Sequence, residues 1–378
     1  MNVLFVTHSV VMGGANRSLL QLMLELRQNH GITPILLMPH IKDKKLTIRE
    51  KCEENDIQCI SSRFYSFKGK PSVISCAKYT LNIFLIILVL IRLRNVKFDL
   101  VHTNSSVIDI GVIVSRIRCV KHIWHLREFG ELDFGLKSLF GKTYEKLVYK
   151  GGNKFIAISN VVKKEYSKVI SQDKIEVIYN GIDEKKIAKT ERHDEGILQI
   201  CMVGAVQSAK NQLEGIKAIE HCVNEGIFNV HLTIIGRLYP PYSDTLQDYV
   251  KRKNLTKYIH FYGESDNVSE LLSKMDIGLT LSVNEAFGRV TVEYMLHGLT
   301  VIASDTGANG ELIKNGVTGF LYSLGDVNEL TDIIRKLLED RYLMHQVSEQ
   351  GRNFALKNFR SIQNSSKISC LYSEIHTV

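Results

Sequence analysis

The strongest constraint on the fold is the regular alternation of short apolar runs with longer amphipathic stretches along the whole chain. The runs are rich in β-branched residues, and most are separated by a helical period such as Asn16–Gln28 or Gln212–Asn224. Strands that alternate with helices through right-handed crossovers form parallel sheets covered on both faces. The pattern predicts strands at Val3–Thr7, Pro34–Met38, Leu100–Thr103, His122–Trp124, Phe155–Ile158, Val177–Tyr179, Gln199–Val203, His231–Ile235, Ile259–Tyr262, Ile277–Leu281, Val301–Ser304 and Gly319–Tyr322.

Length divides this pattern into two domains. A chain of 378 residues is too long for a single ordinary hydrophobic core, and its length fits two domains of roughly 180 residues. Both halves open alike, because FVTHSVVMGGANRSLLQLM and CMVGAVQSAKNQLEGIKAI each read as strand, glycine-containing loop and helix. The Asn180 and Gly181 turn and the polar residues Asp183 to Glu195 form the linker. We expect an α/β protein with Rossmann-like domains at 1–182 and 183–359 facing each other across a cleft, and a C-terminal helix at about 360–378 packed back on the first domain.

The N-terminal sequence and the cysteine pattern indicate the cellular compartment in which the protein is expected. MNVLFVTHS enters an apolar run without the basic stretch, long hydrophobic segment and cleavage site of a secretory signal. The seven cysteines are scattered and contain no CxxC pair, so they read as reduced thiols. We therefore expect a cytoplasmic protein, and 44% hydrophobic with 23% charged residues fits a globular one.

The positive charge is confined to the first half of the chain. Residues 1–180 hold 27 Lys and Arg against 15 Asp and Glu, a balance of +12, whereas the whole chain is +8 and the remainder therefore −4. Such a half can meet an anionic membrane, a nucleic acid or an acidic substrate, or it can be a solvated basic face. No basic and aromatic platform accompanies the charge, which argues against nucleic acid.

One apolar segment, Leu81–Ile91, raises the question of membrane contact. It is far shorter than the roughly 20 residues of a spanning helix. An interfacial helix and a buried helix of the first domain are both compatible with it, and we favour the buried helix. The basic residues that bracket the segment nevertheless suggest reversible docking on an anionic membrane. They are Lys68, Lys70, Lys78, Arg92, Arg94 and Lys97.

The stretch Ser282–Ser304 carries the most informative chemistry. A polar loop with Glu285 follows a predicted strand, and a helix should begin at Arg289, directly after Gly288. A helix N-terminus offers unpaired amides and partial positive charge, and a glycine allows close approach of an anion such as a diphosphate. Glu293, one turn into the helix, can accept hydrogen bonds from two adjacent hydroxyls.

Further sequence pieces connect this stretch to a known family. They are, in order, GGANRSLL, VHTNSS, HLREF, IAISN, YNGID, VGAVQSAKNQ, IIGR and NGVTGFLY. Together with two glutamates seven residues apart around an FG turn and the later Glu311 segment, they resemble the retaining glycosyltransferases of family four, group 1, with the two-domain GT-B fold. The resemblance covers nearly the whole chain. It implies a sugar-nucleotide-dependent glycosyltransferase whose C-terminal domain holds the nucleotide.

The resemblance implies roles for residues of the second domain. Glu293 should bind the nucleotide ribose, and Glu285 should contact the donor sugar beside the amides of Phe287 and Gly288. Lys210 matches the family lysine that neutralises the diphosphate and stabilises its departure. The remaining residues expected to bind the donor are Gly204, Arg237, Arg289, Val290 and Thr291.

The chain departs from the family at Ala205. Members usually carry an arginine directly after the glycine that stands here as Gly204, so one phosphate-binding cation is missing. Arg289 or Arg237 could replace it, and the sequence leaves both open.

The resemblance also marks residues of the first domain. Gly13 and Gly14 form a turn that in the family lies near the donor phosphates and the acceptor. His125 in WHLREF matches a histidine that contacts the transferred sugar or assists the acceptor hydroxyl. His8 and His102 also end predicted strands and are weaker candidates.

The expected reaction is transfer with retention by positioning and leaving-group stabilisation, without a protein nucleophile. No DxD motif follows a strand, so we expect no metal and no cofactor. The partners expected are a nucleotide-sugar donor, UDP being the commonest in the family, and a glycan or lipid-linked acceptor in surface polysaccharide biosynthesis.

Three other functions remain open at this point. A sugar-nucleotide epimerase would need acid and base groups around the sugar. A non-catalytic sugar-nucleotide-binding homologue is favoured by Ala205 and opposed by Glu285, Glu293 and Lys210. A dinucleotide oxidoreductase is disfavoured because no GxGxxG follows the first strand.

Overall fold

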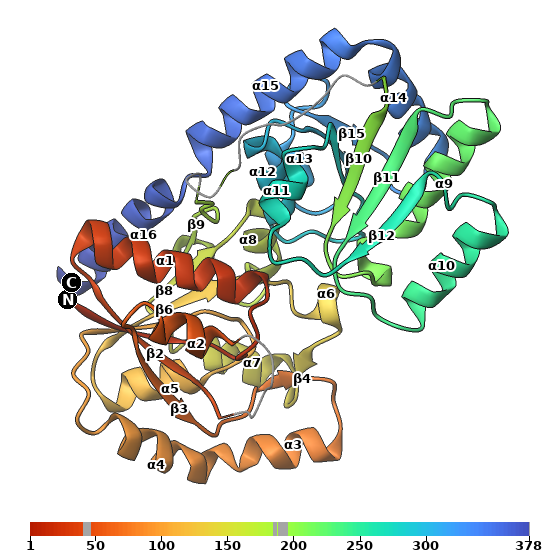
Figure 1. The fold of residues 1–378 in the computed structure, drawn as a ribbon. Helices are drawn as coiled ribbons and strands as arrows, with labels where there is room; N and C mark the ends of the chain where they lie inside the picture. The colour runs from red at the N-terminus through yellow and green to blue at the C-terminus, as the bar shows by residue number, and fades with distance from the viewer. Residues whose placement is uncertain (41–46, 184–186, 188–195, 378) are drawn as a thin grey trace. The chain divides into compact units, whose positions relative to one another are not determined.

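The computed structural model describes residues 1–40, 47–183, 187 and 196–377. They divide into two units (Figure 1). Unit 1 holds Met1–Gly181 and the C-terminal segment from Ser361, and unit 2 holds Ile182–Arg360. This division lies within a residue of the expected domain limits. Most of the predicted linker, Asp183 to Glu195, lies outside the described residues.

Unit 1 is built on a seven-stranded parallel sheet of order β3-β2-β1-β5-β6-β8-β9. Its strands are β1 (Asn2–Val6), β2 (Thr33–Pro39), β3 (Gln58–Ser62), β5 (Leu100–Thr103), β6 (Lys121–Leu126), β8 (Lys154–Ala157) and β9 (Ile175–Val177), and β4 (Lys68–Gly69) pairs antiparallel with β7 (Lys137–Ser138). Its helices are α1 (Gly14–His30), α2 (Ile48–Glu53), α3 (Val73–Thr80), α4 (Asn82–Leu93), α5 (Ile110–Ile117), α6 (Glu131–Phe134), α7 (Gly141–Tyr149), α8 (Asn160–Tyr166), the 3-10 turn η1 (Gln172–Lys174) and α16 (Ser361–Thr377).

Helices cover both faces of this sheet and thereby bury its central strands. One face packs against α1, α2 and α16, and the other against α4 and α5. On the first face α16 returns from the far end of the chain and lies along α1 (Figure 1). Its Ile368, Leu371 and Tyr372 join a core with Leu22 and Leu26 of α1. Unit 1 is therefore completed by the C-terminal segment.

Unit 2 is built on a six-stranded parallel sheet of order β12-β11-β10-β13-β14-β15. The strands are β10 (Leu198–Val203), β11 (Val230–Ile235), β12 (Ile259–Gly263), β13 (Ile277–Thr280), β14 (Thr300–Ser304) and β15 (Phe320–Tyr322). The helices are the 3-10 turn η3 (Ser208–Lys210), α9 (Gln212–Asn224), α10 (Tyr242–Arg252), α11 (Val268–Leu272), α12 (Arg289–Leu296), α13 (Asn309–Leu312), α14 (Val327–Glu339) and α15 (Arg341–Asn358). The predicted α/β class with two parallel sheets is confirmed.

Each of the predicted strands is present, with ends shifted by up to two residues. The prediction missed β3, which lies at the edge of the sheet and, among the described strands, pairs with β2 alone. Its sequence, QCISS, lacks an apolar run because an edge strand is only partly covered. The short β4 and β7 pair was also missed.

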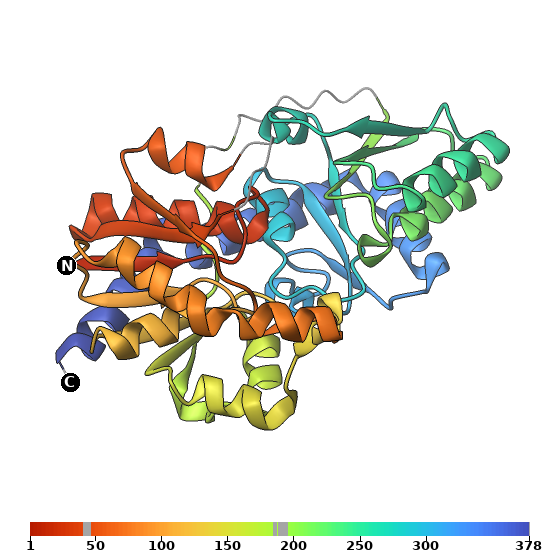
Figure 2. The same ribbon diagram turned by 90° about the horizontal axis from the view of Figure 1, so that it is seen from below.

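The expectation of a buried helix at Leu81–Ile91 is wrong. Only Asn82, Val89 and Leu93 of α4 are buried, whereas Ile83 and Phe84 are 71% and 69% exposed. The helix is an outer layer of unit 1 and has no further element packed over it, as seen from below in Figure 2. In the described part of the chain no single helix is long and apolar enough to cross a membrane; α3 and α4, bent by 41°, pass that test only as a pair and by length and composition alone.

Candidate active site

The sheet of unit 2 reverses its strand order between β10 and β13. From β10 the chain continues to β11 and β12 on one side, and from β13 to β14 and β15 on the other. The loops that leave such a pair of strands diverge and form the binding crevice of open parallel sheets. Lys210 follows β10 and Glu285 follows β13. The two residues therefore come from the two loops at the point where binding is expected.

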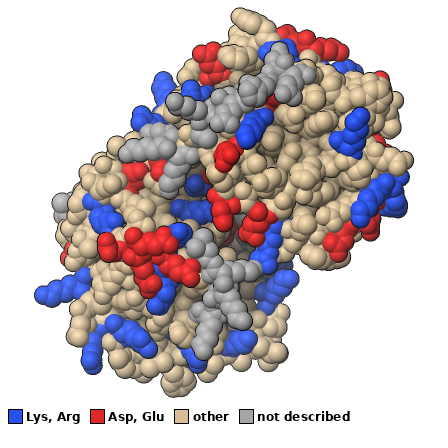
Figure 3. Space-filling model, viewed as in Figure 1, with Lys and Arg blue, Asp and Glu red and all other residues tan. Residues whose placement is uncertain are grey.

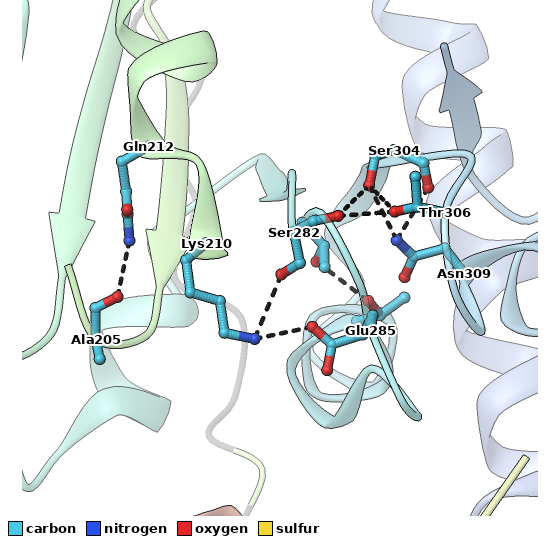
Figure 4. Close-up of polar contacts among 10 residues, drawn as sticks. Ala205, Lys210, Gln212, Ser282, Glu285, Ser304, Thr306 and Asn309 are labelled. Atoms are coloured by element: carbon cyan, nitrogen blue, oxygen red, sulfur yellow. Dashed lines mark hydrogen bonds and ion pairs between the residues drawn. The ribbon is translucent and has the colours of Figure 1, made fainter. Parts of the chain in front are cut away.

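Lys210 and Glu285 are joined by an ion pair. Lys210 Nζ lies 2.8 Å from Glu285 Oε2 and 3.3 Å from Ser282 Oγ (Figure 4). The side chains are 35% and 16% exposed, respectively. Because the pair is only partly hydrated, its charges are less screened than those of a surface pair. The site thus presents one cation and one carboxylate side by side.

A second loop, after β14, holds the Glu285 loop in place (Figure 4). Ser304 and Thr306 hydroxyls both donate to the carbonyl of Ser282, at 2.9 and 2.7 Å. The amide of Ala308 donates to the Glu285 carbonyl at 2.8 Å. A Cβ on Gly307 would lie 2.3 Å from that carbonyl oxygen, so only glycine permits the approach. These supporting residues were not predicted, although Ser304 ends the stretch Ser282–Ser304 and the others directly precede Glu311.

Gly288, the residue before α12, has a backbone conformation that favours glycine. Its φ is 88°, and an added Cβ would lie 2.8 Å from a Leu312 side-chain carbon. The first intrahelical bond is donated by Val292 to the Gly288 carbonyl, so the amides of Val290 and Thr291 precede it and have no acceptor within the helix. Phe287 is buried against Phe359 and fixes the turn. The predicted helix start directly after Gly288 is therefore present, and a helix N-terminus of this kind can bind an anion.

The side chains of α12 divide between the core and the site. Thr291 is buried and donates to the Thr280 hydroxyl at 3.1 Å. Tyr294 accepts from the Val203 amide at 2.6 Å and so connects α12 to the end of β10. Arg289 and Glu293 form an ion pair of 2.8 Å, and their side chains are 24% and 23% exposed. The Glu293 carboxylate is thus accessible to solvent and is already paired with the Arg289 guanidinium.

Gly204 and Gly236 lie back to back in adjoining loops. A Cβ on Gly236 would come within 1.9 Å of the Gly204 carbonyl oxygen. The following residues continue the contact, because the Val206 amide donates to the Arg237 carbonyl at 2.8 Å. Arg237, stacked 5.1 Å from the Tyr239 ring centre, is therefore held by its backbone in the loop beside Ala205.

In unit 1 His125 lies within β6 and belongs to a buried polar cluster. Its Nδ1 lies 3.1 Å from His102 Nε2 and 3.4 Å from Arg127 Nη2. Burial and the neighbouring Arg127 charge hold the pKa of His125 well below 6.5. A guanidinium only donates, so Nδ1 accepts and the proton of the neutral ring lies on Nε2. That Nε2 is buried without a partner among the described residues, a donor aimed at no protein acceptor.

His102 belongs to the same cluster and is engaged on both nitrogens. Its Nδ1 lies 2.6 Å from the Tyr372 hydroxyl of α16, and its Nε2 faces His125. Burial, with the charge of Arg127 as a second cause, lowers the pKa of His102 as well. The structure therefore places His102 as a support for His125.

Arg127 was missed as a site residue, although HLREF contains it. It is buried, and it donates to Asn104 Oδ1 and Asn180 Oδ1. Asn104 in turn donates to the Ala15 carbonyl at 3.3 Å. This chain of contacts connects His125 to the start of α1. A buried charge needs such partners, so a charged residue within an apolar segment is the signal that could have identified it.

Gly13 and Gly14 occupy the start of α1 as predicted, Gly13 as the residue before the helix. A Cβ on either would meet nothing within 4 Å inside the protein. The turn is fixed instead by Asn16, which accepts from Thr7 and donates to the carbonyls of Ser9 and Val11. Asn16 was not predicted. His8 lies in this loop, and its Nδ1 is buried without a partner in the described residues.

In the described ranges no group of three or more His, Cys, Asp and Glu side chains is placed to hold a metal ion.

Two family models divide the chain between them. Residues 12–186 match the model described as Glycosyltransferase Family 4. Residues 183–354 match the model described as Glycosyl transferases group 1. The chain belongs to the family 4, group 1 glycosyltransferases.

Individual members of this family are distant relatives. The chain is 28% identical over 228 residues to the N-acetyl-alpha-D-glucosaminyl L-malate synthase of Bacillus anthracis, a match that covers 58% of this chain and 59% of that protein. It is 27% identical over 299 residues to an Escherichia coli UDP-Gal:alpha-D-GlcNAc-diphosphoundecaprenol alpha-1,3-galactosyltransferase, which covers 75% of this chain and 77% of that one.

Solved structures share the fold over the full length. Anabaena HepE, crystallised with UDP, has a TM-score of 0.82 at 21% identity and covers 99% of this chain and 100% of its own. Staphylococcus aureus TarM, in a complex containing UDP, has a TM-score of 0.75 at 12% identity, and each chain is covered fully. The fold is that of these GT-B glycosyltransferases.

Proposed function

We propose that this protein transfers a sugar, with retention of anomeric configuration, from a nucleoside diphosphate donor to a hydroxyl of a glycan or lipid-linked acceptor. The observation that carries the proposal is the pairing of Lys210 with Glu285 at the strand-order reversal of unit 2, beside the glycine-led N-terminus of α12. A cation and a helix N-terminus favour a diphosphate, while a carboxylate favours sugar hydroxyls.

The diphosphate would be held by Lys210, by the amides of Val290 and Thr291, and by a further arginine. Arg237 is supported by its place in the loop beside Ala205. Arg289 is supported by its position at the start of α12. Its ion pair with Glu293 would place it beside the carboxylate that binds the ribose. These groups stabilise the negative charge that develops on the departing nucleoside diphosphate.

The two glutamates would divide the donor between them. Glu293, accessible on the first turns of α12, would accept hydrogen bonds from the ribose hydroxyls. Glu285 would accept from hydroxyls of the transferred sugar, since its loop is fixed by the backbone contacts to the segment after β14. Its ion pair with Lys210 fixes the position of the carboxylate.

His125 would act as a hydrogen-bond donor. Its Nε2 proton has no protein acceptor in the described residues, and an oxygen of the donor sugar or acceptor would satisfy it. We assign no protein nucleophile, so catalysis would depend on positioning and on leaving-group stabilisation. Because Lys210 and the helix N-terminus supply positive charge at the diphosphate, we propose that turnover needs no metal. A chelator should leave the rate unchanged.

UDP is the nucleotide we favour. The Escherichia coli relative carries UDP-Gal in its name, and HepE and TarM were crystallised with UDP. The same relative acts on a diphosphoundecaprenol-linked sugar, which supports a lipid-linked acceptor and a place on the cytoplasmic membrane face in surface polysaccharide assembly.

The test is a thermal-shift screen of the purified protein against a panel of sugar nucleotides, followed by turnover of the best ligand. A UDP-sugar should raise the melting temperature and be consumed, and proton NMR should show retention of the anomeric configuration. A donor that binds without being consumed, in the presence of acceptor extracts, would favour the non-catalytic homologue that Ala205 suggests. No shift with any sugar nucleotide would refute the proposal.

A further inference from the structure

We propose that the outer surface of α3 and α4 inserts into the interface of an anionic lipid bilayer. The apolar face consists of Val73, Ile74, Ile83, Phe84, Ile87 and Ile91, each more than half exposed. Helices α3 and α4 are consecutive and lie along one edge of unit 1 (Figures 1 and 2). An exposed apolar patch of this kind marks an interaction surface.

The opposite side of the helix pair is anchored in unit 1. The Tyr79 hydroxyl donates to Asp109, and the Asn82 side chain bonds both the amide and the carbonyl of Tyr65 at 2.9 and 2.8 Å. Val89 and Leu93 are fully buried in the core. These residues follow one another at helical spacing, so the anchored stripe and the apolar face are different sides of the same helices. The pair can therefore lie on a bilayer while remaining part of the domain.

The charge around the apolar face fits an anionic surface. Between Ile57 and Phe98 the sequence contains no Asp or Glu, and Lys70, Lys78 and Arg92 are exposed. Arg94 and Lys97 are exposed as well. Figure 3 shows this lower edge of unit 1 with basic and uncharged atoms but without acidic ones. Basic side chains that border an apolar helix face are the pattern of an interfacial helix.

Lys68 does not belong to this basic border, although it was included from the sequence. Its side chain is 5% exposed, and it is bonded to Glu145 at 2.5 Å. A lysine in a buried ion pair cannot reach lipid headgroups. The lipid-facing charge is therefore carried by the five exposed basic residues.

A second copy of the chain fits the apolar face less well than an anionic bilayer does. Two copies that met there through a twofold axis would bring the same basic residues together, with no carboxylate in this segment to balance them. Anionic headgroups supply that balance. The proposal does not depend on nucleotide binding, because the apolar face and the Lys210 site belong to different units.

The experiment is co-sedimentation of the full-length protein with vesicles of phosphatidylcholine alone or mixed with phosphatidylglycerol, at low and high salt. The wild type should sediment with the anionic vesicles, and part should stay bound at high salt because apolar insertion is not screened. The Phe84→Glu and Ile87→Glu double variant should lower the partition coefficient by at least about tenfold. Phe228→Glu, 58% exposed in unit 2, is the matched control and should bind like the wild type.

Three results would overturn the proposal. The wild type could remain in the supernatant with anionic vesicles, the double variant could sediment like the wild type, or the wild type could be a dimer that the double variant converts to a monomer. Emission of Trp124, the single tryptophan, verifies that unit 1 of the variant is folded. UDP affinity measured on the same samples keeps the two proposals separate, since vesicle binding without UDP binding would refute only the proposed function.

Discussion

At the scale of single residues, the two glutamates around α12 should be separable by experiment. Glu293→Ala should weaken UDP binding roughly ten- to a hundredfold, because a charged acceptor for the ribose is lost. Glu285→Ala should leave UDP affinity nearly unchanged and abolish transfer. Calorimetry with UDP and a donor-turnover assay measure the two effects. Glu339→Ala is the control, because Glu339 is exposed at the end of α14. Unaltered UDP affinity in Glu293→Ala would contradict the assignment of Glu293 to the ribose.

His125 should remain neutral across the working pH range. Burial and Arg127 hold its pKa well below 6.5, so its neutral form, with the proton on Nε2, persists as the pH falls through 6.5. The pH profile of kcat/KM should therefore show no inflection from His125 between about pH 6 and 8. A fall in activity near pH 6.5 that disappears in His125→Gln would show that this ring titrates during catalysis.

The sequence predicts the charged residues of the candidate site but not the residues that hold them in place. Lys210, Glu285 and Glu293 stand at motif positions that can be read directly from the sequence. Arg127, Asn104 and Gly307 act through contacts with residues distant in the chain, such as Asn180 and Glu285. Those contacts depend on tertiary folding, and local patterns of polarity do not encode them.

At the scale of elements, the loops after β10 and β11 approach so closely that position 236 should accept no side chain. Gly236→Ala would place a Cβ within 1.9 Å of the Gly204 carbonyl oxygen, and backbone cannot rotate away as a side chain can. We expect a loss of about 1–3 kcal/mol in the free energy of unfolding and weaker UDP binding. Circular dichroism melting and the UDP-induced shift measure both. Gly13→Ala, which meets nothing within 4 Å, should melt like the wild type, and equal melting of both variants would contradict this account.

Helix α4 shows where periodicity misleads. An unbroken apolar run predicts burial on every side, yet only the stripe that contains Val89 and Leu93 is covered. Whether a second layer packs over a helix depends on the rest of the chain, and here none does in the described residues. The central parallel strands were predictable because they are buried on both faces and therefore largely apolar.

At the scale of the whole molecule, unit 1 should require the C-terminal helix. A chain that ends at Arg360 loses Ile368, Leu371, Tyr372 and Ile375 from the core of the first sheet. Each such side chain contributes roughly 1.5–3 kcal/mol, so the loss approaches the stability of a typical domain. Urea unfolding followed by Trp124 emission should give a much lower midpoint or no folded baseline. A chain that ends at His376 is the control, and an unchanged midpoint for the longer truncation would be inconsistent with this packing.

The most direct test of the central claim is a calorimetric comparison of UDP and uridine binding in the wild type and in Lys210→Ala. If unit 2 holds a nucleoside diphosphate at its strand-order reversal, UDP should bind the wild type far more tightly than uridine. Lys210→Ala should weaken UDP roughly ten- to a hundredfold, as expected for a lost charge-assisted bond, and leave uridine nearly unchanged. No UDP binding by the wild type, or equal losses for both ligands, would contradict the account.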